Sequence, residues 1–157
     1  MKRVYDDVTD DEYNQFRSVL GATMWLLRTR GELAYVASIL ASAVNTLRVE
    51  HVLKLNKVVR YLQLTSTHKL FLPRLEGDLW VAGICDAAAG QEVINISERA
   101  AGRYHGGFVI GIRSSHGGHG FAPIIWKSSK LKRVSGSSMD GETLIAMETT
   151  EVVLCLS

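Results

Sequence analysis

The spacing of apolar residues changes near the middle of this chain, and that change most constrains what it can fold into. The first part repeats apolar residues at helical spacing in three stretches, 13–28, 32–44 and 49–64. The second part gathers them in short runs of strand length, at 79–85, 106–112 and 121–128. A final helical stretch covers 142–154. We therefore predict an α+β fold with a helical unit, 1–65, followed by a β-β-β-α unit, 66–157.

Residues that begin or end such elements refine this prediction. Asp10 or Asp11 is expected to cap the first helix, because a short polar side chain there accepts from free backbone N–H groups. Gly31 is expected to stop that helix. We expect a short extended segment at 66–73, and a loop or insertion at 87–103.

Composition excludes several classes of protein. Only two prolines occur, so the chain is not a Pro-rich linker. Cys85 and Cys155 are too few and too far apart to suggest a zinc site or a disulfide framework. The sequence contains no run of eighteen apolar residues, so no membrane span is predicted. The acidic residues that follow Lys2 and Arg3 argue against a signal peptide. We expect an intracellular protein, with cytoplasm, nucleus and organelle all open.

Positive charge is concentrated in two places, although the net charge is only +2. The stretch 48–74 contains six basic residues and a single acidic residue, Glu50. A second block, 127–133, holds four basic residues and no acid. Such patches suit phosphates, and the alternative is an ordinary solvated face.

Six segments occur in order along the chain: Tyr13–Gly21, Thr29–Tyr35, Glu50-His51 with Val58–Thr65, Val81–Ala88, Gly106–Val109, and Ile125–Lys132 with Ser137, Ser138 and Glu142. In this order they resemble the copia-type retrotransposon polyprotein, from the end of its reverse transcriptase into the first half of ribonuclease H. Together they span nearly the whole chain. The resemblance implies a helical unit of the connection type, then a truncated ribonuclease H-like unit. Gly31 departs from the family, which has proline there, and so does Ala88, where the family has a second acid.

The resemblance also implies a chemistry, the cleavage of RNA in an RNA–DNA hybrid. In that reaction carboxylates hold two divalent metal ions, and Mg²⁺ suits such oxygen ligands. Asp86 matches the first carboxylate, at the end of an apolar strand, and Glu142 matches the second, at the start of the last helix. Ordinary alternatives are an Asp at a strand exit and a first-turn acid beside the helix dipole. Asp140 is an N-cap candidate and a weaker ligand candidate.

The family's third acidic ligand has no counterpart before Ser157, and Glu148 and Glu151 do not match it. We therefore expect that the chain alone does not catalyse. Histidines 105, 116 and 119, and serines such as Ser128, are expected to be ordinary loop residues.

Two functions compete at this point. In the first, the piece binds RNA or an RNA–DNA hybrid through basic residues that contact phosphates. These are Lys54, Lys57, Arg60, Lys127, Lys130, Lys132 and Arg133. In the second, it is a domesticated structural subunit of a larger complex, such as a ribonucleoprotein, and a partner chain completes its sheet at an exposed edge.

Overall fold

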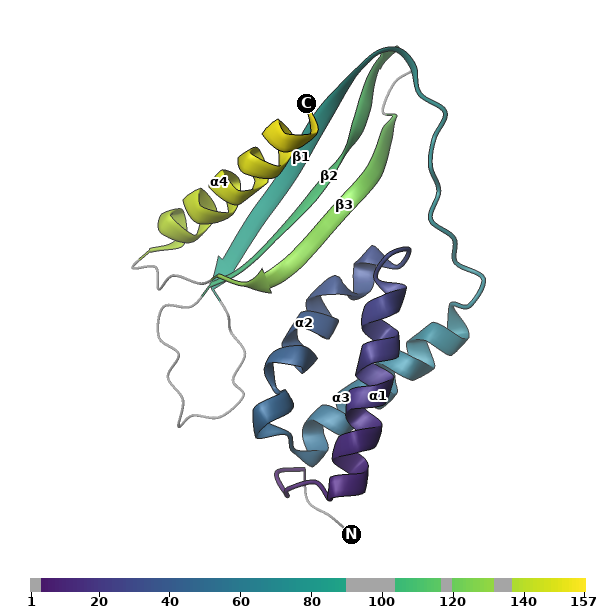
Figure 1. Cartoon of the computed structure of the whole chain (residues 1–157), viewed down its shortest axis with the longest axis vertical. Helices are drawn as coiled ribbons and strands as arrows, with labels where there is room; N and C mark the ends of the chain where they lie inside the picture. The colour runs from purple at the N-terminus through teal and green to yellow at the C-terminus, as the bar shows by residue number, and fades with distance from the viewer. Residues whose placement is uncertain (1–3, 90–103, 117–119, 132–136) are drawn as a thin grey trace. The chain divides into compact units, whose positions relative to one another are not determined.

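A computed structural model describes residues 4–89, 104–116, 120–131 and 137–157. The chain divides into two compact units, Met1–Leu70 and Phe71–Ser157. The first contains α1 (Asp10–Leu26), α2 (Ala34–Ser42) and α3 (Val49–Leu64), with short 3₁₀ turns at Gly31–Leu33 and Val44–Thr46 (Figure 1). The second contains β1 (Glu76–Ala89), β2 (Tyr104–His116), β3 (Phe121–Lys130) and α4 (Ser138–Leu156). The predicted α+β class is confirmed.

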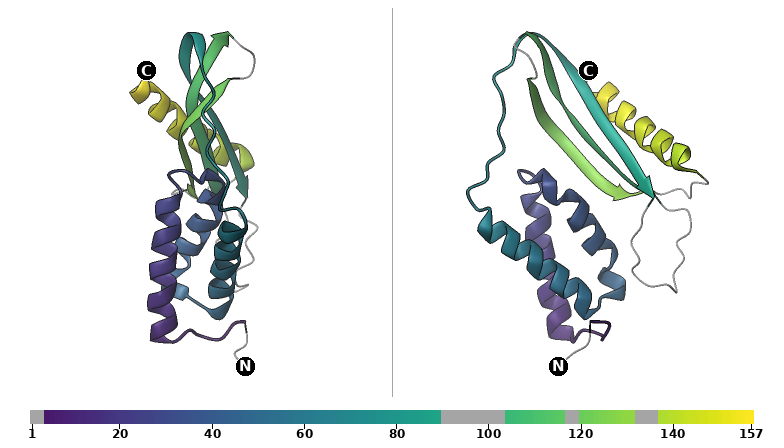
Figure 2. Two further views of the ribbon diagram at one scale, coloured as in Figure 1. Left: turned by 90° about the vertical axis from the view of Figure 1, so that its right-hand side faces the viewer. Right: turned by 180° about the vertical axis from the view of Figure 1, so that it is seen from behind.

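Helices α1, α2 and α3 bury their apolar stripes against one another. Figure 2 shows the backbones of these helices from two further sides. Each stripe repeats at three- and four-residue spacing, which puts its members on one helical face. The buried core consists of Phe16, Leu20, Leu33, Leu40, Leu47, Leu55 and Val58.

The first helix begins and ends differently from our expectation. Its N-cap is Thr9, not Asp10 or Asp11. The Thr9 hydroxyl accepts from the Glu12 N–H at 3.3 Å, while the Glu12 carboxylate accepts from the Thr9 N–H at 2.7 Å. This reciprocal pair satisfies two N–H groups, whereas either aspartate alone would satisfy fewer. Gly31 opens a 3₁₀ turn after the helix has already ended at Leu26, and the expected extended segment at 66–73 is not a strand.

Strands β1, β2 and β3 form an antiparallel sheet in that order. β1 pairs with β2 from Glu76 opposite His116 to Ala89 opposite Tyr104. A bulge between Glu76 and Leu79 includes Gly77 at φ 82°, a conformation that glycine adopts without strain. All three strands extend beyond the predicted apolar runs, because a sheet with one open face accepts polar residues at alternate positions.

Helix α4 packs on one face of this sheet, against β1 and β2 (Figure 1). Side chains alternate along a strand, so Val81, Cys85 and Ala87 share the face that meets α4. Gly83 lets the helix approach closely, since a Cβ there would lie 2.7 Å from the Thr149 methyl carbon. The opposite face, which we call the open face, exposes Trp80, Ile84, Val109 and Ile124.

The last helix begins four residues before the predicted Glu142. Ser137 is its N-cap, and its hydroxyl accepts from the Asp140 N–H at 3.2 Å. The Asp140 carboxylate accepts from the Ser137 N–H at 3.1 Å, so Asp140 completes the cap from inside the helix and is not the N-cap. Glu142 therefore lies in the second turn. Among the described residues, no helix is both long and apolar enough to cross a bilayer.

Candidate nucleic-acid interface

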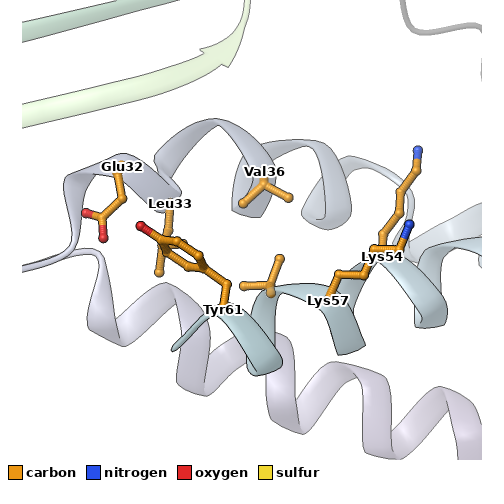
Figure 3. Close-up of a pocket in the computed structure, with 7 residues that line it drawn as sticks. Glu32, Leu33, Val36, Lys54, Lys57 and Tyr61 are labelled. Atoms are coloured by element: carbon orange, nitrogen blue, oxygen red, sulfur yellow. The ribbon is translucent and has the colours of Figure 1, made fainter. Parts of the chain in front are cut away.

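A groove of about 440 Å³ lies on the surface of the first unit, between the segment 32–36 and α3 (Figure 3). Its floor is apolar, formed by Leu33, Val36 and Val58. Figure 3 shows Tyr61 and Glu32 toward one end and Lys54 and Lys57 toward the other. The groove thus joins an aromatic ring, an apolar floor and two ammonium groups.

Helical spacing explains why three of these side chains line the same groove. Lys54, Lys57 and Tyr61 are three and four residues apart on α3, so they follow one edge of the helix. The neighbouring Leu55 and Val58 are buried in the core and hold that edge beside the groove. Arg60 is exposed and does not line the groove. Of the three predicted phosphate contacts on α3, two therefore lie together and Arg60 lies apart.

Arg30 supports the tyrosine end of the groove, and sequence reasoning missed it. Its guanidinium is buried and donates to the Glu32 carboxylate at 2.5 Å, to the Thr65 carbonyl at 3.2 Å and to the Thr65 hydroxyl at 2.7 Å. It also lies 5.6 Å from the centre of the Tyr61 ring. Hydrogen bonding to Glu32 raises the pKa of Arg30 further above its ordinary value. The available signal was an arginine followed two residues later by a glutamate, between two helices.

His51 is a buried titratable group in the same helix. Its Nδ1 accepts from the Arg48 N–H at 3.0 Å and thereby caps α3. Its Nε2 lies 3.9 Å from the Glu50 carboxylate, and neither atom has a hydrogen-bond partner in the described part of the chain. Burial lowers the pKa of His51, because a charged imidazolium is poorly solvated there.

The two predicted carboxylate ligands lie in the second unit. Asp86 is exposed near the end of β1, and its Oδ1 accepts from the Ala87 N–H at 2.9 Å. Because Cys85 and Ala87 contact the α4 side, Asp86 leaves the sheet on the open face. Glu142 is exposed on α4, one position after Gly141, which packs beside Tyr104. The structure brings the two residues to one end of the sheet, on different faces.

This arrangement bears on the predicted Mg²⁺ site. Two carboxylates bind one metal ion only if both point to a common position. Asp86 lies on the open face, whereas Glu142 belongs to α4, which packs on the other face. Within the described ranges, no group of three or more His, Cys, Asp or Glu residues could hold a metal ion. No catalytic step follows from Asp86 and Glu142 alone. The site stays a prediction of the resemblance.

The second basic block does not form one surface. Lys127 forms an ion pair with Glu148 of α4, so it lies on the helix-covered face. Lys130 is three positions further along β3, which reverses the face, and it is exposed. Lys132 and Arg133 lie outside the described residues. Strand alternation therefore separates charges that are neighbours in sequence.

Three residues expected in loops, His105, His116 and Ser128, are strand residues instead. His105 is buried in β2, and its Nε2 lies 2.7 Å from the Ser128 hydroxyl in β3. Burial lowers the pKa of His105, and the positive charge of the nearby Lys130 lowers it further. His116 ends β2 and His119 lies outside the described residues. A histidine beside two glycines resembles a turn in sequence, but Gly106 allows close packing in the sheet, since a Cβ on it would lie 2.9 Å from Leu131.

Comparison with known proteins supports a retroelement origin. The chain is similar to the retrovirus-related Pol polyprotein from transposon RE1 of Arabidopsis thaliana, at 27% identity over 129 residues. The match covers 82% of this chain and spans only 8% of the length of that polyprotein. No family model matches the chain, and no solved structure matches it. The similarity supports derivation from a retrotransposon polyprotein; the copia type and the region remain predictions.

Proposed function

We propose that this retroelement-derived chain binds RNA or an RNA–DNA hybrid through its helical unit. Lys54 and Lys57 on the groove would contact the phosphates, and the exposed Arg60, elsewhere on α3, would add a further contact. Such contacts read backbone and shape, so little sequence preference is expected. The segments resemble the end of reverse transcriptase and the first half of ribonuclease H, and both enzymes act on this class of substrate.

The observation that carries this proposal is the availability of the α3 charges. Among the described residues, none of Lys54, Lys57 and Arg60 forms an ion pair, whereas Lys127 forms one with Glu148. An ammonium group that already faces a carboxylate gains less from a phosphate than one that faces only water. The helical unit therefore offers the stronger polyanion surface.

A binding assay on a labelled RNA–DNA hybrid tests the proposal. The triple variant Lys54→Gln, Lys57→Gln, Arg60→Gln should weaken binding and flatten its salt dependence, by about 0.7–0.9 in log–log slope for each phosphate that is no longer neutralised. Lys127→Gln, which removes an ion-paired lysine, is the matched control and should bind like the parent chain. A triple variant with unchanged affinity and slope would overturn the proposal.

The β1 edge favours a second candidate function. In the described sheet β1 pairs only with β2, so the N–H and C=O groups along its other edge meet no strand. An added strand from a partner could bond to them, as in a structural subunit of a ribonucleoprotein. Hydrogen exchange distinguishes the cases. Slow exchange of the outer β1 amides only in a stoichiometric complex would support this candidate, and fast exchange in every complex would exclude it.

Cleavage with Mg²⁺ is tested separately. We expect the chain alone to leave a labelled RNA–DNA hybrid intact in the presence of Mg²⁺. Robust cleavage that Asp86→Asn abolishes would contradict this expectation and restore the ribonuclease H assignment. Binding of the hybrid without cleavage would agree with the first proposal.

A further inference from the structure

We propose that the groove of the helical unit holds one unstacked nucleotide of a single strand, with its base against Tyr61 and its phosphates at Lys54 and Lys57. This inference rests on the proposed nucleic-acid binding and adds a specific site to it. Within that function the groove would take an unpaired nucleotide of the bound strand, because a base inside a duplex has both faces covered by its neighbours.

Shape and surface chemistry agree with a nucleotide. A nucleobase is flat, has two apolar faces and carries its polar groups on its rim. The groove has an apolar floor of Leu33, Val36 and Val58, and a tyrosine that is 39% exposed at one end. Its volume of about 440 Å³ is in the range of pockets that bind small ligands. Stacking on an aromatic ring is the usual way in which proteins hold bases of single strands.

The tyrosine ring is held in place before any ligand binds. Arg30 packs against it and is itself fixed by hydrogen bonds to Glu32 and Thr65. The Thr65 hydroxyl in turn donates to the Tyr61 carbonyl at 2.7 Å. Arg30 does not line the groove, so the ring presents another side to it. A ring that is already ordered loses less conformational entropy when a base stacks on it.

Charge along the groove matches the two ends of a nucleotide. The phosphates of a nucleotide are anionic and its base is neutral, while the groove has two lysines at one end and a tyrosine at the other (Figure 3). Glu32 lies at the tyrosine end, where its ion pair with Arg30 offsets its charge. An acidic amphipathic protein helix is the competing occupant. Such a helix uses four anchors over two turns, whereas this floor offers three apolar side chains.

The test compares two single strands of twelve units with the same phosphates, one of deoxyadenosine and one with every base removed. The chain should bind the strand with bases about fivefold or more tightly, which corresponds to the stacking of one base. Tyr61→Ala should abolish this preference, and Tyr61→Phe should retain it. Tyr35→Ala removes an exposed tyrosine that does not line the groove and should leave the preference unchanged. Lys57→Gln should weaken the binding of both strands by the same factor.

The outcomes separate this inference from the proposed function. Equal binding of the two strands by the parent chain would overturn the nucleotide site and leave phosphate binding intact. Failure to bind either strand or the hybrid would overturn both. A preference that survives Tyr61→Ala would also overturn the site. The same follows if a Leu/Glu amphipathic helical peptide binds in a Tyr61-dependent way while oligonucleotide binding is independent of Tyr61.

Discussion

The two units of this chain cover their apolar residues to different degrees. In the first, three helices bury one shared core that includes Phe16 and the fully buried Leu40. In the second, α4 covers one face of the sheet and buries Ile110, while Ile84 on the open face is 64% exposed. Helices meet around an axis and can cover one another, but one helix covers only one side of a sheet.

This difference shows where each unit has surface left for a partner. The helical unit offers a small polar-rimmed groove with two lysines, which suits a ligand that carries both charge and a flat apolar part. The sheet unit offers an apolar open face and a strand edge, which suit another polypeptide. The two candidate functions therefore draw on different units.

The largest expected effect on stability comes from truncating an apolar side chain in the covered core of the helical unit, compared with the same change on the open face of the sheet. Leu40→Ala should lower the free energy of unfolding by about 2–5 kcal/mol, because it leaves a cavity in the helical core. Ile84→Ala should change it by about 0.5 kcal/mol or less, as at an ordinary surface position. Urea unfolding measures both. A large loss from Ile84→Ala would show that the open face is covered in solution.

The next largest effect on stability is expected where α4 closely approaches the sheet. Gly83→Val places a side chain where even a Cβ would lie 2.7 Å from Thr149 and 3.2 Å from Val153. Overpacking of this kind should cost about 1–3 kcal/mol, measured by thermal unfolding. Gly21→Ala is the control in the helical unit, because nothing lies within 4 Å of its Cβ position. That change should stabilise α1 by about 0.5–1 kcal/mol. Equal effects of the two changes would contradict the close contact.

The smallest expected effect is a pH dependence from the buried histidine of the helical unit. Burial holds the pKa of His51 below its ordinary value of 6.5, so the unfolded chain binds a proton more readily than the folded one. The stability is therefore complete above about pH 6.5 and is lost as the pH falls toward the folded pKa, by at most about 1.4 kcal/mol per pH unit.

Urea unfolding between about pH 7.5 and 5 checks this sign, since that range spans the ordinary histidine pKa. His51→Gln should reduce the slope of stability against pH. His68→Gln, at an exposed position, should leave the slope unchanged. A stability that rises as the pH falls, and that depends on His51, would show the opposite sign of the pKa shift.

Much of the fold was predictable from sequence, because apolar periodicity reflects which face of each element is buried. The third helix was predicted at 49–64 and is observed at Val49–Leu64. Element ends were less predictable. Thr9 and Ser137 cap their helices only through reciprocal bonds with Glu12 and Asp140, and nearby aspartates were equally plausible candidates in sequence.

The candidate site was only partly predictable. Lys54 and Lys57 were predicted as phosphate contacts, and they lie on one groove. The groove itself was not predicted, because its floor comes from residues more than twenty positions apart, such as Val36 and Val58. Arg30 was missed for the same reason, since its partner Thr65 is 35 residues away.

The sequence by itself determined the class of fold, the order of its elements and the basic character of α3, since these depend on local spacing and composition. The tertiary structure alone decided which charges share a surface. Lys127 and Lys130 are neighbours in the chain, yet strand alternation puts them on opposite faces of the sheet, and α4 supplies Glu148 to only one of them. Packing of α3 beside the segment 32–36 likewise turned a charged helix edge into a groove with an ordered tyrosine. Contacts between distant segments create such sites, and no local pattern encodes them.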